Sequence, residues 1–202
     1  MAIALHAVRL SKARPGQSIL ILGTGVIGTS VLALLKLYRG LHIVCVDLLA
    51  ERLARAREMG ADVTVQAAEG ERELAALEIE KALGTAGADI VFECAGAPDT
   101  LWNMCEATAP GAHVIVIGSN PEDTVAFSSG AARRNGVTLR FVRRSLNTLK
   151  PCIDLAGGGL IVPGDLVTHE FAAPDAAAAY ELVERAADGV LKAVIDMREW
   201  GA

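Results

Sequence analysis

Three glycines follow the apolar run Ile19–Leu22 in the spacing Gly-x-Gly-x-x-Gly: Gly23, Gly25 and Gly28. Glycines at this spacing allow a tight turn, a close approach of the backbone to a pyrophosphate, and close packing of the helix that follows. The next apolar run ends in Asp47, where a carboxylate can accept hydrogen bonds from ribose hydroxyls. The pattern therefore predicts a dinucleotide-binding crevice. The alternative is a plain tight turn, which needs neither three glycines nor a terminal acid.

The residues at and after Asp47 indicate which dinucleotide binds. A carboxylate at this position repels a 2′-phosphate, and the next residues are Leu48, Leu49 and Ala50, none of them basic. NAD is therefore favoured over NADP. Arg52 lies further along, keeps NADP as the less favoured alternative, and is itself a candidate cofactor contact.

Apolar runs alternate with segments that favour helices, and this alternation must position the glycines and the acid. The predicted strands lie near residues 18–22, 42–46, 62–65, 89–93, 112–117 and 137–142. The predicted helices lie near residues 3–14, 26–39, 50–59, 69–83 and 98–107. Strands that alternate with helices at this spacing form βαβ units. We expect an α/β Rossmann fold with a doubly wound, parallel, six-stranded sheet and a short C-terminal α/β appendage.

The carboxyl ends of parallel strands meet at one edge of a sheet, so residues that follow different strands should line one crevice. Gly23, Asp47, the run Cys94–Gly96 and the pair Gly118–Ser119 all follow predicted strands. We expect them to lie close together.

The last part of the chain has a different pattern. It predicts a helix near 147–156, a short extended piece near 166–168, a helix at 174–188 and a closing strand at 192–196. The predicted organisation is a leading helix at 1–16, an NAD-binding Rossmann domain at 17–145, and a C-terminal segment at 146–202.

The composition of the chain argues against some classes of binding partner and some cellular locations. With 52% hydrophobic residues, the 202-residue chain can form a large core, and its formal net charge of −5 argues against nucleic acid. The uncharged stretch Pro15–Leu35 is interrupted by the three glycines, so no membrane span is expected. The start of the chain lacks the pattern of a signal peptide, and the four cysteines form no CxxC pair. We therefore expect a cytoplasmic protein with reduced thiols.

Five blocks occur in order along the chain: AIALHAVRLSKARPGQSILILGTGVIG, VDLLAERLARAREMGAD, GADIVFECAGAPDTL, PGAHVIVIGS and LVTHEF…KAVID. Together they resemble the medium-chain, zinc-type alcohol and polyol dehydrogenases, and they cover essentially the whole chain. The resemblance implies an oxidoreductase coenzyme domain. Family members carry a catalytic domain, with the zinc ligands and the proton relay, before the point that this chain matches. The four histidines here form no zinc-ligand pattern, so no zinc is expected.

The resemblance carries over to the cofactor contacts. It implies backbone amides of Val26 and Ile27 at the pyrophosphate and Asp47 at the ribose. Further contacts are expected along the crevice at Ala95, Gly96, Ile117, Gly118 and Ser119. Arg143, or Arg144 beside it, resembles an arginine that can reach phosphate; the alternative is a solvated arginine. The resemblance also implies a homodimer through the sheet edge near 137–142.

Three functions remain open on the sequence alone. The first is an NAD(H)-binding oxidoreductase half that needs a missing catalytic domain or a separate catalytic chain for hydride transfer. The second is a non-catalytic NAD(H)-binding module or pseudoenzyme. The third is different chemistry on bound NAD, with Cys94 or Glu93 as the base, although Glu93 more often has a structural role.

Overall fold

Six parallel strands form the main sheet, in the order β3-β2-β1-β4-β5-β6. This computed structural model describes residues 1–84, 87–120, 122 and 124–198. The strands are β1 (Ser18–Leu22), β2 (His42–Asp47), β3 (Val63–Gln66), β4 (Ala88–Glu93), β5 (Thr108–Val116) and β6 (Thr138–Phe141). The strand order reverses direction between β1 and β4, which is the arrangement of a doubly wound Rossmann sheet. The predicted fold class is confirmed.

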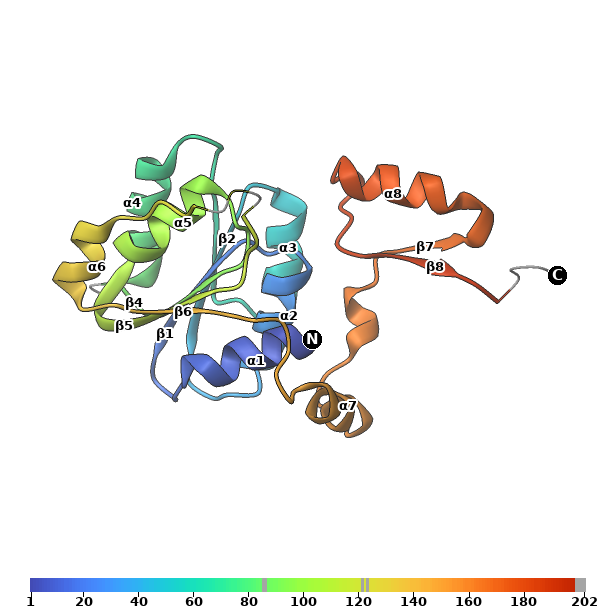
Figure 1. The fold of residues 1–202 in the computed structure, drawn as a ribbon, viewed down its shortest axis with the longest axis horizontal. Helices are drawn as coiled ribbons and strands as arrows, with labels where there is room; N and C mark the ends of the chain where they lie inside the picture. Colours follow the sequence, from blue (N-terminus) through green and yellow to red (C-terminus); the bar gives the residue numbers. More distant parts are fainter. Residues whose placement is uncertain (85–86, 121, 123, 199–202) are drawn as a thin grey trace.

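Helices cover both faces of the sheet (Figure 1). One face packs on α1 (Ala2–Ser11), α2 (Val26–Leu35) and α3 (Ala50–Glu58). The other packs on α4 (Arg72–Leu83), α5 (Pro98–Glu106) and α6 (Ser129–Asn135). Because both faces are covered, the central strands read as continuous apolar runs, and every residue of β1 is buried.

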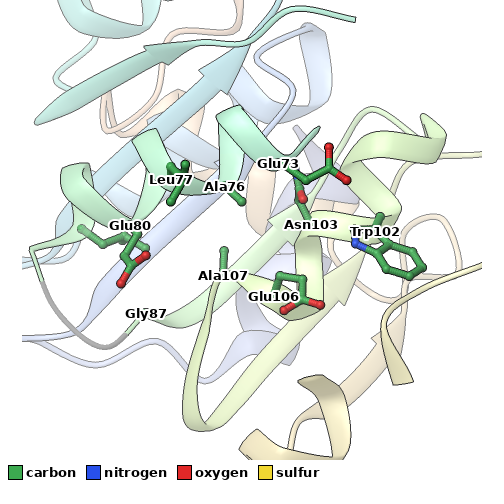
Figure 2. A pocket seen from close by; sticks show the side chains of 10 residues that line it. Glu73, Ala76, Leu77, Glu80, Gly87, Trp102, Asn103, Glu106 and Ala107 are labelled. Carbon is green, nitrogen blue, oxygen red and sulfur yellow. The ribbon is translucent and has the colours of Figure 1, made fainter. Parts of the chain in front are cut away.

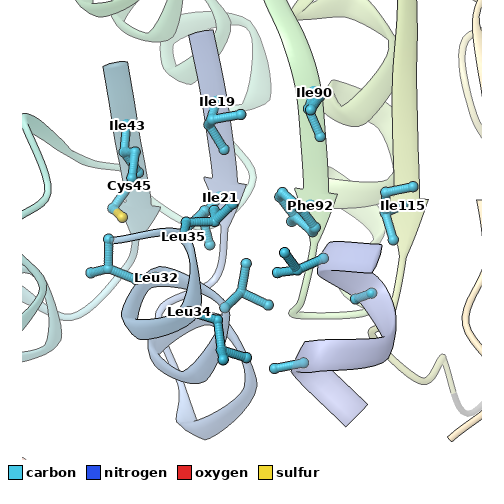
Figure 3. Close-up of a cluster of buried hydrophobic side chains, with 14 of the residues drawn as sticks. Ile19, Ile21, Leu32, Leu34, Leu35, Ile43, Cys45, Ile90, Phe92 and Ile115 are labelled. Atoms are coloured by element: carbon cyan, nitrogen blue, oxygen red, sulfur yellow. The ribbon is translucent and has the colours of Figure 1, made fainter. Parts of the chain in front are cut away.

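Two apolar cores separate on the two faces of the sheet because side chains alternate along a strand. Ile19 and Ile21 of β1 point into the core under α1 and α2, together with Phe92 of β4 (Figure 3). Leu20 and Leu22 point into the opposite core, under α4 and α5. The strand ends are held between these two cores, which gives the residues after them a rigid base.

The C-terminal part begins with a helix that packs on the core under α1 through Cys152, and it continues into a small two-stranded unit beside the main sheet (Figure 1). Its elements are α7 (Leu149–Gly157), two short 3₁₀ segments η1 (Pro163–Leu166) and η2 (Ala173–Asp175), β7 (His169–Ala172), α8 (Ala176–Glu184) and β8 (Ala193–Asp196). Strands β7 and β8 pair in parallel as a two-stranded sheet. The expected α/β appendage is confirmed, whereas the domain boundaries stay a prediction.

Several helices are shorter than predicted. α1 ends at Ser11 instead of residue 14 because Lys12 takes a left-handed conformation, with φ of 56°. α2 ends at Leu35, and residues 36–39 form turns and bends. α8 spans 176–184 instead of 174–188, because η2 precedes it and Ala186 is left-handed, with φ of 46°.

Strand β5 begins earlier than predicted, at Thr108, and runs through the Pro110–Gly111 pair that was predicted to turn the chain. The pairing with β4 shifts at this point. Ala88 lies opposite Thr108, and Ile90 lies opposite His113, so two steps along β4 match five along β5. The proline and the glycine, which has φ of 79°, accommodate the irregularity.

Two further elements differ from the sequence prediction. Helix α6 was not predicted, although Ser128 before it and Gly136 after it have the residue types of a helix start and stop. The extended piece expected at 166–168 lies three residues later, as β7. No helix of the described residues is long and apolar enough to cross a membrane.

A test of the packing at the glycine turn is Gly28→Ala. An added Cβ at Gly28 would lie 1.9 Å from the Gly23 carbonyl oxygen, so we expect a loss of about 1–3 kcal/mol or more in the free energy of unfolding. Urea denaturation measures it. Gly157→Ala in α7, with no atom within 4 Å of the new methyl, is the control and should not lose stability. Equal stability of the two variants would contradict the expectation.

Candidate functional site

A crevice of about 610 Å³ lies at the carboxyl ends of β1, β2 and β4. This is the edge at which open α/β sheets bind ligands. Five of the predicted site residues line it: Gly23, Gly25, Asp47, Arg52 and Ala95. The structure thus brings together residues from three strand ends and from the first turn of α3.

The three glycines meet three different constraints. Gly23 has φ of 89°, and an added Cβ would lie 2.9 Å from the Ala95 Cβ. At Gly25 an added Cβ would contact only a terminal nitrogen of Arg52, at 3.8 Å, so its surface faces open space in the crevice. Gly28 packs against the Gly23 carbonyl, as described above. Of the three glycines, Gly25 is therefore the one that leaves room for a ligand.

Val26 and Ile27 are the first two residues of α2, directly after Gly25. The first N–H groups of a helix have no acceptor within the helix, and the helix dipole favours negative charge there. No acidic residue lies in this first turn. The helix start therefore presents amide donors next to the open face of Gly25, which suits an anionic phosphate.

Asp47 ends β2 and is nearly buried. Its Oδ2 accepts hydrogen bonds from the Thr24 amide (2.6 Å) and the Thr24 hydroxyl (3.0 Å), while its Oδ1 accepts one from the Leu49 amide (3.0 Å). A carboxylate offers about four acceptor positions. Three are used, so one remains for a ligand in the crevice.

Arg52 extends from α3 toward the glycine turn. Its Nε is buried and has no hydrogen-bond partner within the described part of the chain. One terminal nitrogen lies 3.8 Å from the position of a Cβ on Gly25. A cation with an unpartnered donor thus lies over the place where the open turn would hold a pyrophosphate.

The loops after β4 and β5 pack on each other beyond the crevice. An added Cβ on Gly96 would lie 2.6 Å from the Ser119 carbonyl oxygen, and one on Gly118 would lie 2.2 Å from the Gly96 amide nitrogen. Gly96, Gly118 and Ser119 therefore lie in direct contact. They do not line the 610 Å³ crevice, and neither does Ile117, whose amide bonds to the Glu93 carbonyl (2.8 Å).

Glu93 joins these two loops from a fully buried position. Its Oε1 accepts hydrogen bonds from the amides of Ala95 (3.0 Å) and Gly96 (2.7 Å) and from the Thr100 hydroxyl (2.8 Å). Its backbone carbonyl accepts the amide of Gly118 (3.0 Å). The side chain therefore has the structural role that the sequence favoured.

Burial raises the pKa of Glu93 above its ordinary value, against the lowering effect of the hydrogen bonds from Gly96 and Thr100. Its Oε2 has no partner among the described residues and lies 2.6 Å from the position of a Cβ on Gly118. Burial also raises the pKa of the Cys94 thiol well above its usual value. A reactive thiolate at Cys94 is therefore disfavoured.

Arg143 lies just after β6, is exposed, and does not line the crevice. The structure does not bring it to the other predicted site residues. The alternative that the sequence left open, a solvated arginine, describes it better.

Sequence reasoning missed the far wall of the crevice. The lining includes residues 67–70, which follow β3, and Asp99 and Asn103 of α5. The Gly70 amide donates to Asp99 Oδ2 (2.9 Å) and ties the two segments together. Because β3 also ends at this edge of the sheet, the topology rule that placed Gly23 and Asp47 could have found residues 67–70 as well.

A second hollow, of about 690 Å³, lies between α4 and α5, away from the glycine turn. Figure 2 shows the acidic residues Glu73, Glu80 and Glu106 around it, with Leu77 and Trp102. It contains none of the predicted site residues. Among the residues that the structure describes, no group of His, Cys, Asp and Glu could hold a metal ion. The described donors therefore do not fit a catalytic zinc.

The raised pKa of Glu93 gives a pH test. A carboxyl whose folded pKa lies above its ordinary value of 4.5 stabilises the fold at low pH, and this stability is lost as pH rises through the folded pKa. Glu93→Gln cannot ionise. We expect wild type to lose stability relative to this variant as pH rises above about 4.5, in urea denaturation from about pH 4 to about pH 8. The exposed Glu184→Gln is the control, and parallel curves for wild type and Glu93→Gln would contradict the expectation.

Comparison with known protein families gives a match over residues 26–157 to a family model described as zinc-binding dehydrogenase. Rat sorbitol dehydrogenase is 30% identical over 185 residues, which are 92% of this chain and 51% of that protein. An uncharacterised zinc-type alcohol dehydrogenase-like protein of Escherichia coli is 30% identical over 198 residues, 98% of this chain and 56% of that protein. The chain spans about half the length of the curated relatives it matches.

Solved structures of dehydrogenases also superpose on most of this chain. An oxidoreductase/dehydrogenase of unknown specificity from Escherichia coli superposes with a TM-score of 0.86 at 30% identity, over 96% of this chain and 55% of that one. An Escherichia coli alcohol dehydrogenase complexed with NADH superposes with a TM-score of 0.83 at 23% identity, over 95% of this chain and 56% of that one. The second likeness shows a shared fold.

Proposed function

Because the chain belongs to the zinc-binding dehydrogenase family, we propose that it binds NAD(H) in the crevice and forms the coenzyme half of an oxidoreductase. The observation that carries this proposal is the pairing of the open glycine turn at Gly25 with Asp47, whose carboxylate keeps one acceptor position free. The structure complexed with NADH supports the cofactor class for this fold.

Different residues of the crevice would contact different parts of the cofactor. The Val26 and Ile27 amides and the Arg52 guanidinium suit the pyrophosphate, and Asp47 suits the adenosine ribose. Bound NAD supplies the acceptor or donor of a hydride. The chain's own residues bind and orient the cofactor along the strand ends. NAD is favoured over NADP because Asp47 would repel a 2′-phosphate, while Arg52 points toward the glycine turn.

Hydride transfer would need groups from elsewhere. Glu93 and Cys94, the sequence candidates for a base, have raised pKa values, and Glu93 is fully buried. We propose that a catalytic domain or a separate catalytic chain provides the proton relay, with the small β7–β8 sheet as its docking point, because two parallel strands rarely stand alone. The same observations favour the second candidate, a non-catalytic NAD(H)-binding module. NAD reduction by alcohols or polyols, followed by NADH fluorescence with a catalytic domain or chain supplied, distinguishes the two, because only the coenzyme half should then show activity.

A homodimer through the outer edge of β6 is part of the proposal. Strand β6 is the last strand of the sheet, and its Phe141 is 60% exposed. An edge strand with an apolar side chain suits pairing with a second copy about a twofold axis. The four free thiols support the proposed cytoplasmic location.

The first experiment is isothermal titration of the purified chain with NADH and then with NADPH, with the metal content measured on the same sample. Tight NADH binding, weak NADPH binding and no zinc would support the proposal. Binding of neither cofactor would overturn it and leave the glycine pattern with a structural role alone.

Asp47→Arg tests the ribose contact. We expect NADH affinity to fall by roughly tenfold to a hundredfold, since a hydrogen bond to a charged group is lost, and NADPH to be relatively favoured. Titration with both cofactors measures it. Gly157→Ala, far from the crevice, is the control. Unchanged NADH affinity in Asp47→Arg would remove this residue from the ribose site.

Phe141→Glu tests the dimer edge. A charge on the apolar edge of β6 should oppose self-association, so we expect a shift from dimer to monomer in light scattering coupled to gel filtration. Tyr180→Glu, at a more exposed position on α8, is the control and should leave the mass unchanged. A monomeric wild type, or a dimer that survives Phe141→Glu, would contradict this interface.

A further inference from the structure

Thr24 lies between the first two glycines of the turn and is 1% exposed. Both of its donors point to a single atom: the amide lies 2.6 Å and the hydroxyl 3.0 Å from Asp47 Oδ2. A generic residue at this position could offer the amide alone. The hydroxyl is therefore a feature of this chain that the glycine pattern does not require.

The backbone around Thr24 is itself held on two sides. The Gly23 amide donates to the Val46 carbonyl (2.8 Å), which joins the turn to β2. The Thr29 hydroxyl donates to the Thr24 carbonyl (2.8 Å), which joins it to α2. With its backbone held in this way, Thr24 cannot follow a movement of Asp47 and instead restrains it.

The restraint decides which edge of the carboxylate faces the crevice. Thr24 occupies both acceptor positions of Oδ2, and the Leu49 amide (3.0 Å) occupies one of Oδ1. The position that remains is on Oδ1. Without the Thr24 hydroxyl, only the amides of Thr24 and Leu49 would hold the carboxylate, and the vacant acceptor position on Oδ2 would let it tilt about its Cβ–Cγ bond and shift its charge relative to a nearby phosphate.

We propose that Thr24 is a positioning residue that sets cofactor choice: its hydroxyl holds the Asp47 carboxylate in the orientation that accepts a ribose hydroxyl and repels a 2′-phosphate. This inference rests on the proposed binding of NAD(H) in the crevice. It assigns discrimination between NADH and NADPH to a pair of residues, one of which does not contact the cofactor.

Thr24→Val removes the hydroxyl and keeps the shape, while Thr24→Ser keeps the hydroxyl. We expect Thr24→Val to weaken NADH binding about tenfold and to reduce the preference for NADH over NADPH by a similar factor. Thr24→Ser should stay close to wild type. Ser11→Ala, which removes a buried hydroxyl in α1, controls for the loss of a buried polar group and should leave the preference unchanged. If Thr24→Val does not fold by circular dichroism, Thr24→Ala takes its place.

A double-mutant cycle separates positioning from a general structural effect. In an Asp47→Ala background the Thr24→Val change should cost no further NADH affinity, because its only route to the cofactor is gone. A full additional loss in that background would overturn the inference, as would a wild-type preference in Thr24→Val. If wild type binds neither cofactor, the proposed function is overturned as well. If wild type binds NADH and Thr24→Val has the same affinity and the same preference for NADH, only the Thr24 inference is overturned.

Discussion

The contact between α2 and the glycine turn is the constraint on which the rest of the site depends. No Cβ fits at Gly28, because the Gly23 carbonyl oxygen occupies its place. This close approach brings the first amides of α2 to the carboxyl end of β1 and leaves the surface of Gly25 open. A bulkier contact would tilt the helix away, and the amides, the open turn and Asp47 would no longer face one volume.

Charges around the crevice are held by backbone amides instead of by opposite charges. Asp47 is held by the amides of Thr24 and Leu49, and Glu93 by those of Ala95 and Gly96. Amides of tight loops cannot reorient freely, so each carboxylate stays in place without an ion pair. Arg52 is the contrasting case, since its buried Nε lacks a partner within the described residues. The crevice therefore keeps a cation available beside a restrained anion, which suits a ligand with a phosphate and a ribose.

The coenzyme half and the C-terminal unit differ in how completely each is covered. The six-stranded sheet has helices on both faces and two closed cores. The β7–β8 pair has one helix, α8, and its strands are only partly buried. Parallel strands gain most of their stability from burial on both faces. This contrast is the physical reason for the proposed docking of another domain or chain on the smaller unit.

The sequence by itself determined the alternation of strands and helices, the glycine turn and the acid at the end of β2, because these features depend on local periodicity and on the chain order of βαβ units. Only the tertiary structure decided the rest. It placed Asp99 and Asn103 of α5 in the crevice and left Arg143 outside it, since both depend on how one element lies relative to its neighbours. It also paired the Thr24 hydroxyl with Asp47 and included Pro110 and Gly111 in β5, where the pairing with β4 shifts register. Side-chain partners and register shifts arise from contacts between distant segments, which no local pattern encodes.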